Sequence, residues 1–385
     1  MLNSRSDIKP AWDLLGLQEK LDPNIQTKQL ELRIQLNQVF RSEINQAFIH
    51  HDFPKNWPKM LANLNLFKDN SDPLWYGIIC QELERIDSGL RTFFSVQNTL
   101  IIKTIQSYAS PEIQSKFLSA LLTCDLIGCF GLSEPQGGSD PNNMQTTAQQ
   151  VEGGWILNGE KAWISNAGHS DLALIWAQTP KGIRCFLVEK DTPGFVQIPI
   201  QNKLSLCASW TGHLKLNNCL VPNQAYFEGT KKGLSTALKS LNQARYGIIW
   251  GVLGAAMDCF EIALDFVKNR SLFQNSLAQK QLVQNSLVDM ALEINKAQLL
   301  NLHLAELKSK NKLDFNAVSL GKINACRQAL NIARNARELL GAQGIALEQN
   351  IFRHMVNLES VLSYEGTEQI HRLILGKSLT GLSAF

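Results

Sequence analysis

The chain has 385 residues, 44% of them hydrophobic, which is more than one compact core usually holds, so we expect two or three packed domains. The formal net charge of +3 comes from mixed acidic and basic residues without long blocks of one sign, which argues against a nucleic-acid partner. The start of the chain has no apolar signal core and no membrane-length apolar stretch follows, so we expect no membrane insertion, and a bacterial cytoplasmic or, if processed, mitochondrial matrix location.

The cysteines and histidines give no sign of a metal site or a disulfide scaffold. Eight cysteines are scattered along the chain, with no CxxC pair and no accompanying histidine spacing typical of zinc. A chain of this size folds without disulfides, so we expect reduced thiols and no bound metal.

Helical patterning dominates the first region, 1–125. It is clearest in ELRIQLNQVFRSEINQAF and PEIQSKFLSALLT, and Ser110-Pro111 at the start of the second stretch is typical of a helix start. We therefore expect an N-terminal α-helical domain.

Short strands are expected in the middle region, 126–230. LALIWA and IRCFLVE are apolar runs of strand length, and Asn158-Gly159 between WIL and EKAWI is typical of a two-residue hairpin turn. The region therefore predicts a β-sheet domain.

Long helices are expected in the last region, 231–385. All twelve prolines lie at or before Pro222, so no proline interrupts a helix beyond that point. Apolar residues recur at steps of three and four from Val283 to Ala297 and from Ala329 to Leu340, and Gly341 is placed to stop the second helix. The fold class is thus α+β and multidomain, with a helical bundle at the C-terminal end.

The common cofactor and nucleophile motifs do not occur in the sequence. There is neither a GxGxxG motif after a strand nor a GxxxxGK[ST] motif, and no GxSxG elbow supplies a hydrolase nucleophile. Four other segments hold the informative residues: GCFGLSEPQGGSD, KAWISNAG, NRSLFQ and YEGTEQIHRLILGK. Taken singly, each has an ordinary explanation: a tight turn, a core tryptophan, a solvated arginine at a helix end and a surface glutamate.

In this order, and across an α, β, α layout, the four segments resemble the acyl-CoA dehydrogenase family over nearly the whole chain. The runs ELERIDSGLR and LNQARYGIIWGVLGA are similar to glutaryl-CoA dehydrogenases in particular. The resemblance implies a C-terminal four-helix bundle, FAD bound between that bundle and the β domain, and removal of two hydrogens from an acyl-CoA thioester. It also implies a homotetramer that passes electrons to an electron-transfer flavoprotein.

The resemblance also implies a set of flavin contacts. They fall on Phe130, Leu132, Ser133, Trp163, Ile164, Ser165, Arg270, Phe273, Gln281, Gly341, Thr367 and Gln369. Trp163 and Ser165 would pack against the isoalloxazine ring, and Arg270 would pair with the pyrophosphate of a neighbouring subunit's FAD. Gln274 follows Phe273 where the family usually has glycine, so we expect an altered turn there.

Glu365 is the candidate catalytic base. It lies in a Gly-Thr turn after the apolar stretch NLESVLSY, and a carboxylate that loses water when substrate binds becomes a stronger base. The resemblance implies that Glu365 takes the α proton while hydride leaves the β carbon for the flavin. Further substrate contacts implied in this way are Ser139, Asn242, Arg245 and Tyr364.

Arg91, in DSGLRTFFSVQ, bears on the choice of substrate. It matches the position where glutaryl-CoA dehydrogenases hold the distal carboxylate, with Thr92 and Ser95 nearby, and a guanidinium deep in an acyl pocket favours a dicarboxylate. Glutaryl-CoA would then give crotonyl-CoA and CO2, as in lysine and tryptophan catabolism. The alternative is a helix-surface arginine paired with Glu84 or Asp87.

Two departures weaken the closer resemblance. LFKDNSDPLWYG replaces a glycine-rich stretch before Glu82, and Cys207 stands where glutaryl-CoA dehydrogenases have arginine. Two alternatives therefore stay open. One is a dehydrogenase for another short-chain acyl-CoA, or a non-decarboxylating glutaryl-CoA dehydrogenase. The other is a catalytically silent flavoprotein or CoA-ester-binding scaffold.

Overall fold

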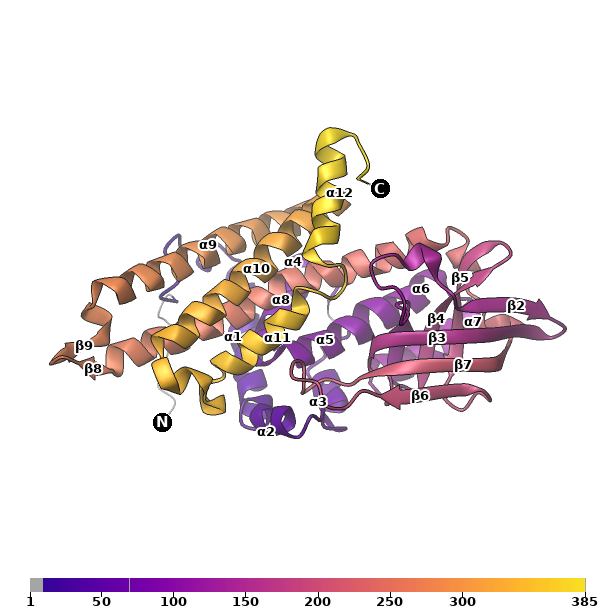
Figure 1. The fold of residues 1–385 in the computed structure, drawn as a ribbon, viewed down its shortest axis with the longest axis horizontal. Helices are drawn as coiled ribbons and strands as arrows, with labels where there is room; N and C mark the ends of the chain where they lie inside the picture. The colour runs from indigo at the N-terminus through magenta and orange to yellow at the C-terminus, as the bar shows by residue number, and fades with distance from the viewer. Residues whose placement is uncertain (1–9, 69, 385) are drawn as a thin grey trace.

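The structure is a computed structural model that describes residues 10–68 and 70–384. A helical region, a β-sheet region and a second helical region follow one another along the chain, so the predicted α, β, α architecture is confirmed (Figure 1). The sheet lies at one end of the elongated molecule. One hydrophobic core joins the two helical regions, and a second core fills the sheet.

The N-terminal region consists of short helices. They are α1 (Pro23–Phe40), α2 (Ile44–Ile49), α3 (Trp57–Asn63), α4 (Pro73–Ile86), α5 (Ser88–Ser95), α6 (Lys103–Tyr108) and α7 (Pro111–Leu122), and a π-helical stretch, η1 (Val96–Ile102), follows α5. In three of them, proline occupies the first position and the preceding side chain accepts a backbone N–H: Asp22, Asp72 and Ser110. The predicted helix start at Ser110 is confirmed.

The middle region forms a seven-stranded sheet of order β1-β4-β2-β3-β7-β6, in which β5 pairs with β4. Its strands are β1 (Gly128–Gly131), β2 (Thr147–Val151), β3 (Gly154–Ser165), β4 (Leu172–Thr179), β5 (Gly182–Glu189), β6 (Phe195–Pro199) and β7 (Thr211–Pro222). β1 and β4 are parallel, whereas β3 and β7 are antiparallel. The runs LALIWA and IRCFLVE form β4 and β5, as predicted.

The predicted hairpin turn at Asn158-Gly159 is wrong. β3 runs through both residues, and the turn that joins it to β2 lies at 152–153. The register with β7 shifts between Leu157 and Gly159, so the Asn-Gly pair forms a bulge instead. At Gly159, whose φ is +144°, a Cβ would come within 2.6 Å of Thr146 Cα, so the backbone just before β2 requires glycine here.

The C-terminal region has long helices around α8. The helices are α8 (Leu234–Asn269), α9 (Gln281–Ser309), α10 (Phe315–Leu339), α11 (Ile351–Val361) and α12 (Glu368–Thr380). Both predicted apolar repeats form helix, in α9 and α10, and α10 ends before Gly341, whose φ is +57°. α8 is long and apolar enough to cross a membrane, but 83% of its most apolar window is buried inside the protein, as in a central core helix.

A small hairpin joins α8 to α9. Its strands are β8 (Ser271–Leu272) and β9 (Asn275–Ser276). Phe273 and Gln274 form the turn, with φ of 51° and 65°. Gln274 therefore adopts a backbone conformation that glycine takes up more easily than other residues. The hairpin projects from the end of the molecule opposite the sheet (Figure 1).

Candidate active site

Glu365 lies in the segment that joins α11 to α12. Its φ is +51° and that of Gly366 is +97°. A residue other than glycine is strained in this left-handed region. The Oε2 atom of Glu365 is buried and has no hydrogen-bond partner within the described residues. Burial raises the pKa of this carboxyl, while Arg245, Arg91 and Lys322 pull it the other way. These are the surroundings of a poised base.

Arg245 on α8 holds the backbone of this segment. Its Nε donates to the carbonyl oxygen of Glu365 at 2.7 Å, and its Nη1 donates to Asn242 Oδ1 at 2.9 Å. Two of the residues predicted to contact substrate are therefore joined to the candidate base by hydrogen bonds.

Arg91 is a buried side chain. Only 1% of it is exposed, and its Nε donates to Glu84 Oε2 at 2.6 Å. Its Nη2 also donates to the hydroxyl of Tyr364, the residue before the candidate base. The pairing with Glu84, which the helix-surface alternative expected, is present, but the burial of Arg91 shows that its placement on a helix surface is wrong.

Several buried hydroxyls near Arg91 lack partners. Thr92 Oγ1, Ser95 Oγ and Tyr76 Oη make no hydrogen bond of good geometry within the described residues, although Tyr76 lies beside Ser95 and Tyr364 lies beside Thr92. Burial raises the pKa of Tyr76 and of Tyr364, so both hydroxyls keep their protons and stay donors. Because buried polar groups are normally paired, this cluster indicates a place for a polar ligand group.

The two predicted flavin segments of the β domain lie side by side. Lys161 Nζ donates to the carbonyl oxygen of Leu132 at 3.1 Å and to Glu134 Oε1 at 2.7 Å, and the Ala162 N–H donates to the Ser133 carbonyl at 2.9 Å. Phe130, in the first of these segments, is buried, with its ring 5.9 Å from that of Trp176. The FGLSEP and KAWIS stretches therefore form one surface.

Trp163 is exposed on this surface. It is 67% exposed with φ +59°, at a second register shift between β3 and β7, whereas the next residue, Ile164, is buried. Ser165 pairs with Thr211 at the end of β3. A large aromatic ring held out of the core on a rigid strand offers a flat apolar face to a ligand.

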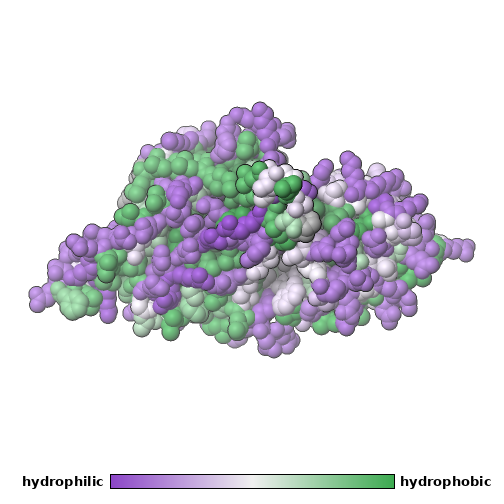
Figure 2. Space-filling view, turned by 45° about the horizontal axis from the view of Figure 1, so that its top comes forward, coloured by the Kyte–Doolittle hydropathy of each residue, from purple (hydrophilic) through white to green (hydrophobic). Residues whose placement is uncertain are grey.

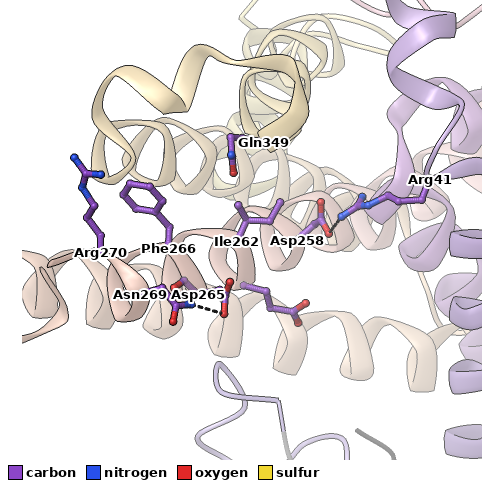
Figure 3. A pocket seen from close by; sticks show the side chains of 9 residues that line it. Arg41, Asp258, Ile262, Asp265, Phe266, Asn269, Arg270 and Gln349 are labelled. Atoms are coloured by element: carbon purple, nitrogen blue, oxygen red, sulfur yellow. Dashed lines mark hydrogen bonds and ion pairs between the residues drawn. The ribbon is translucent and has the colours of Figure 1, made fainter. Parts of the chain in front are cut away.

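Other predicted flavin residues lie elsewhere in the chain. Arg270 and Phe273 lie at the β8–β9 end of the molecule, far from the sheet (Figure 1), and Gln281 is exposed at the start of α9. Arg270 and Phe266 line a cavity of about 610 Å³ at this end (Figure 3). The remaining predicted ligand contacts are exposed or half-buried: Ser139, Gly341, Thr367, which caps α12, and Gln369.

The two departures from the family pattern are packed into the protein. Asp72 caps α4, and Asn70 donates to Asn98 Oδ1 at 3.0 Å, whereas Asp69 lies outside the described residues. Cys207 is buried, and the preceding Leu206 N–H donates to Asn357 Oδ1 at 2.7 Å. Asn357 also bonds Asp87, the cap of the helix that bears Arg91.

Sequence reasoning missed three polar side chains that the structure places at the site: Lys161, Lys322 and Tyr76. A signal existed for Lys322, because it stands in the buried stripe of α10 with Val318, Ala325 and Ala329. No local pattern marks Tyr76. Within the described residues, no group of three His, Cys, Asp or Glu is placed to hold a metal ion, and all eight cysteines are buried and free.

Comparisons with known proteins identify the family. The chain matches the N-terminal, middle and C-terminal domains of acyl-CoA dehydrogenases over residues 29–125, 129–219 and 231–380. The human mitochondrial short-chain specific acyl-CoA dehydrogenase is 33% identical over 313 residues, which are 80% of this chain and 76% of that protein.

Solved structures are similar over almost the whole chain. Glutaryl-CoA dehydrogenase from Mycobacterium smegmatis has a TM-score of 0.96 at 40% identity and covers 98% of this chain and 100% of its own. A glutaryl-CoA dehydrogenase structure from the same organism, in complex with FADH2, has a TM-score of 0.93 at 41% identity over 95% of this chain and 96% of that one. By sequence and by fold, the chain belongs to the acyl-CoA dehydrogenase family.

Proposed function

We propose that this acyl-CoA dehydrogenase oxidises and decarboxylates glutaryl-CoA. The observation that carries the proposal is the buried Arg91, whose bonds to Glu84 and Tyr364 use two of its three nitrogen atoms. The remaining N–H donors of Arg91, beside the Thr92 and Ser95 hydroxyls that lack hydrogen bonds of good geometry, suit a second carboxylate, which a butyryl chain lacks. The similarity to two Mycobacterium glutaryl-CoA dehydrogenase structures supports this choice of substrate.

FAD is the cofactor, and the surface around Trp163 fits it. The exposed indole, with the Ser165 hydroxyl nearby and the backbone of the FGLSEP stretch beside it, offers a flat apolar face edged by hydrogen-bonding groups. The residues proposed to hold FAD within this chain are Phe130, Leu132, Ser133, Trp163, Ile164, Ser165, Thr367 and Gln369. When bound, FAD supplies the hydride acceptor.

Glu365 is the proposed base that removes the α proton of the thioester. Its Oε2 is free of protein partners within the described residues, and burial raises its pKa, so at working pH it is a stronger base than a solvated glutamate. Arg245 fixes the backbone of the base, and Arg91 holds the distal end of the substrate. The α carbon would then lie between two anchored points.

Decarboxylation follows from the same arrangement. Loss of the α proton and of a β hydride converts glutaryl-CoA to glutaconyl-CoA. The bond between the γ carbon and the distal carboxylate then breaks, CO2 leaves, and the electron pair stays behind as a dienolate. Protonated Glu365 returns its proton to the γ carbon, which gives crotonyl-CoA and restores the base.

We also propose a homotetramer that passes electrons to an electron-transfer flavoprotein, in the bacterial cytoplasm or the mitochondrial matrix. Arg270 and Phe273 lie at the β8–β9 end of the molecule, away from the sheet that carries Trp163, so they would reach the FAD of a neighbouring subunit and not the FAD of their own chain. Apolar side chains also gather on the helical half of the surface (Figure 2). On α9 they include the exposed Leu292 and Leu299, which would be covered in an assembly.

The test compares substrates in Arg91 variants. Wild type, Arg91→Lys and Arg91→Met are assayed with glutaryl-, butyryl- and isobutyryl-CoA and an artificial electron acceptor. We expect Arg91→Met to lose about 100-fold or more in kcat/KM for glutaryl-CoA and only a few-fold for butyryl-CoA, because only the dicarboxylate loses an ionic partner. In Arg91→Met, Glu84 loses its partner and becomes an unpaired buried charge. If this prevents folding, the double variant Glu84→Gln, Arg91→Met removes that charge.

Equal losses for both substrates would overturn the distal-carboxylate role. Wild type that oxidises glutaryl-CoA labelled in the distal carboxylate without releasing labelled CO2 would be the non-decarboxylating alternative. A chain that binds FAD but never bleaches with any acyl-CoA under anaerobic conditions would be the silent scaffold.

A further inference from the structure

Lys322 is a buried cation that faces the catalytic loop. The structure describes all of α10, and Lys322 is the only charged residue among the buried residues of this helix. Only 2% of the Lys322 surface is exposed. Its Nζ donates to the carbonyl oxygen of Tyr364 at 2.9 Å and to that of Gly366 at 2.8 Å. A lysine in an apolar stripe costs desolvation energy, so these two bonds need an explanation beyond packing.

The bonds of Lys322 complete a pattern at three successive residues. The carbonyl oxygens of Tyr364 and Gly366 accept from Lys322, and the one between them, on Glu365, accepts from Arg245 at 2.7 Å. Every peptide oxygen of the base and its two neighbours is thereby held by a buried cation. Because Glu365 has a positive φ, this backbone would relax toward commoner conformations without tertiary contacts to hold it.

We propose that Lys322 is a positioning residue that fixes the backbone on both sides of Glu365 and so aims its carboxylate at the substrate α carbon. The proposal rests on the proposed role of Glu365 as the base, but not on which acyl group is oxidised. Lys322 donates to backbone oxygens on both sides of the base, so it acts through the loop.

Lys322 also belongs to the set of charged and titratable groups that face Glu365. Arg245 comes from α8, Arg91 from α5 and Lys322 from α10, and each lowers the pKa of Glu365 against the larger effect of burial. From α12, His371 Nε2 lies close to Gly366, and burial lowers the His371 pKa to about 3, so this ring is neutral at working pH. Cys326 lies near Lys322, and burial keeps its thiol protonated.

A purely structural role for Lys322 would give different results. If Lys322 only tied α10 to the loop for stability, its substitution would lower the Tm or the FAD content and leave the rate per folded active site unchanged. A positioning role acts on proton abstraction itself, because a small displacement of a catalytic group costs rate even in a stable protein.

The experiment compares Lys322→Met with Lys322→Arg in the FAD-loaded enzyme. Lys308→Met is the control, because Lys308 is a half-buried lysine of the same bundle that bonds Gln243 and lies over the Tyr246 ring, away from the loop. For Lys322→Met we expect kcat per bound FAD to fall about 100-fold with little change in KM, and the α-deuterium isotope effect to rise. Losing a cation raises the pKa of Glu365, so the acidic limb of kcat/KM moves to higher pH. Arginine, which keeps the charge and the donors, recovers part of the rate.

A second measurement needs no dehydrogenation. 3-Thiabutyryl-CoA has acidic α hydrogens but sulfur in place of the β carbon, so its α hydrogens can exchange with D2O while no hydride can leave. We expect exchange, followed by NMR, to be fast in wild type and in Lys308→Met and slow in Lys322→Met. Unchanged exchange and pH limb in a folded Lys322→Met would overturn the positioning role.

The two possible failures are distinguishable. If Lys322→Met does not fold, Lys322→Arg decides, because a displaced guanidinium must still change the isotope effect or the pH limb if positioning matters, and wild-type values for both would overturn the proposal. If wild type turns over another acyl-CoA but not glutaryl-CoA, the substrate proposal fails and the role of Lys322 is tested with that substrate. If wild type exchanges no α hydrogen at all, Glu365 is not the base, and the positioning role falls with it.

Discussion

Gly251 on α8 lies against Glu84 on α4 so closely that a Cβ at Gly251 would come within 2.2 Å of Glu84 Oε2 and 3.1 Å of Arg91 Nε. Both atoms belong to the ion pair that orients Arg91, and both side chains are buried. The helix that forms the core of the C-terminal region therefore leaves room for a charged pair on the N-terminal region. The position of Arg91, and with it the proposed acyl site, depends on this contact between distant parts of the chain.

Gly251→Ala is expected to displace the Glu84–Arg91 pair. Overpacking of this kind costs about 1–3 kcal/mol of unfolding free energy, and the misplaced guanidinium lowers kcat/KM for glutaryl-CoA more than for butyryl-CoA. The control is Gly376→Ala in α12, where a Cβ would meet no atom within 4 Å. That change should stabilise the protein by about 0.5–1 kcal/mol through helix propensity and leave both activities unchanged. Chemical denaturation and substrate kinetics on both variants check the contrast, and equal behaviour of the two would contradict it.

Trp163 provides a test of the flavin face that separates binding from folding. Because the side chain is 67% exposed, Trp163→Ala should change the unfolding free energy of the FAD-free protein by no more than about 0.5 kcal/mol. We expect it to weaken FAD binding, measured by titration of the apoprotein and flavin fluorescence. Trp176→Ala, at a fully buried position of β4, should instead destabilise the fold by roughly 3–5 kcal/mol. Unaltered FAD affinity in Trp163→Ala would remove this residue from the flavin site.

The sequence predicted the elements whose signals are local. Helix repeats in α9 and α10, the strand runs of β4 and β5 and the Ser110-Pro111 start all depend on neighbours within a few positions along the chain. The prediction of a hairpin turn at Asn158-Gly159 was wrong because the same dipeptide occurs in turns and in bulges. Which of the two forms here depends on contacts with β7 and Thr146, which a local sequence pattern does not include.

The site was predictable where motif residues act in their own segment, and less so where they act across the fold. Glu365 and Arg91 were both predicted from their own segments, and the structure joins them through Tyr364, but the burial of Arg91 comes from packing that no single segment encodes. Lys322 donates to carbonyl oxygens up to 44 residues away along the chain. Its place in an apolar stripe shows that it faces inward, yet nothing in α10 identifies the loop that it meets.

The pH dependence of catalysis tests the surroundings of Glu365 directly. Burial raises the pKa of this carboxyl, and Arg245, Arg91 and Lys322 offset that rise only in part. A base acts only when deprotonated, so activity is present above the raised pKa and is lost as the pH falls through it. The acidic limb of kcat/KM, which reports the free enzyme, should therefore lie above the value of about 4.3 that an unperturbed glutamate shows.

Arg245→Met should move that limb further up, because it removes one of the cations that lower the pKa of Glu365. Glu365→Gln, which keeps the shape of the side chain, should lower kcat by about 100-fold to 10,000-fold while FAD stays bound. The measurement is a steady-state pH series with butyryl- and glutaryl-CoA at fixed ionic strength. An acidic limb at the ordinary glutamate value, or substantial turnover by Glu365→Gln, would mean that another group takes the α proton. Because Arg91 and Lys322 act through the same local field, the limb must also shift when either is neutralised.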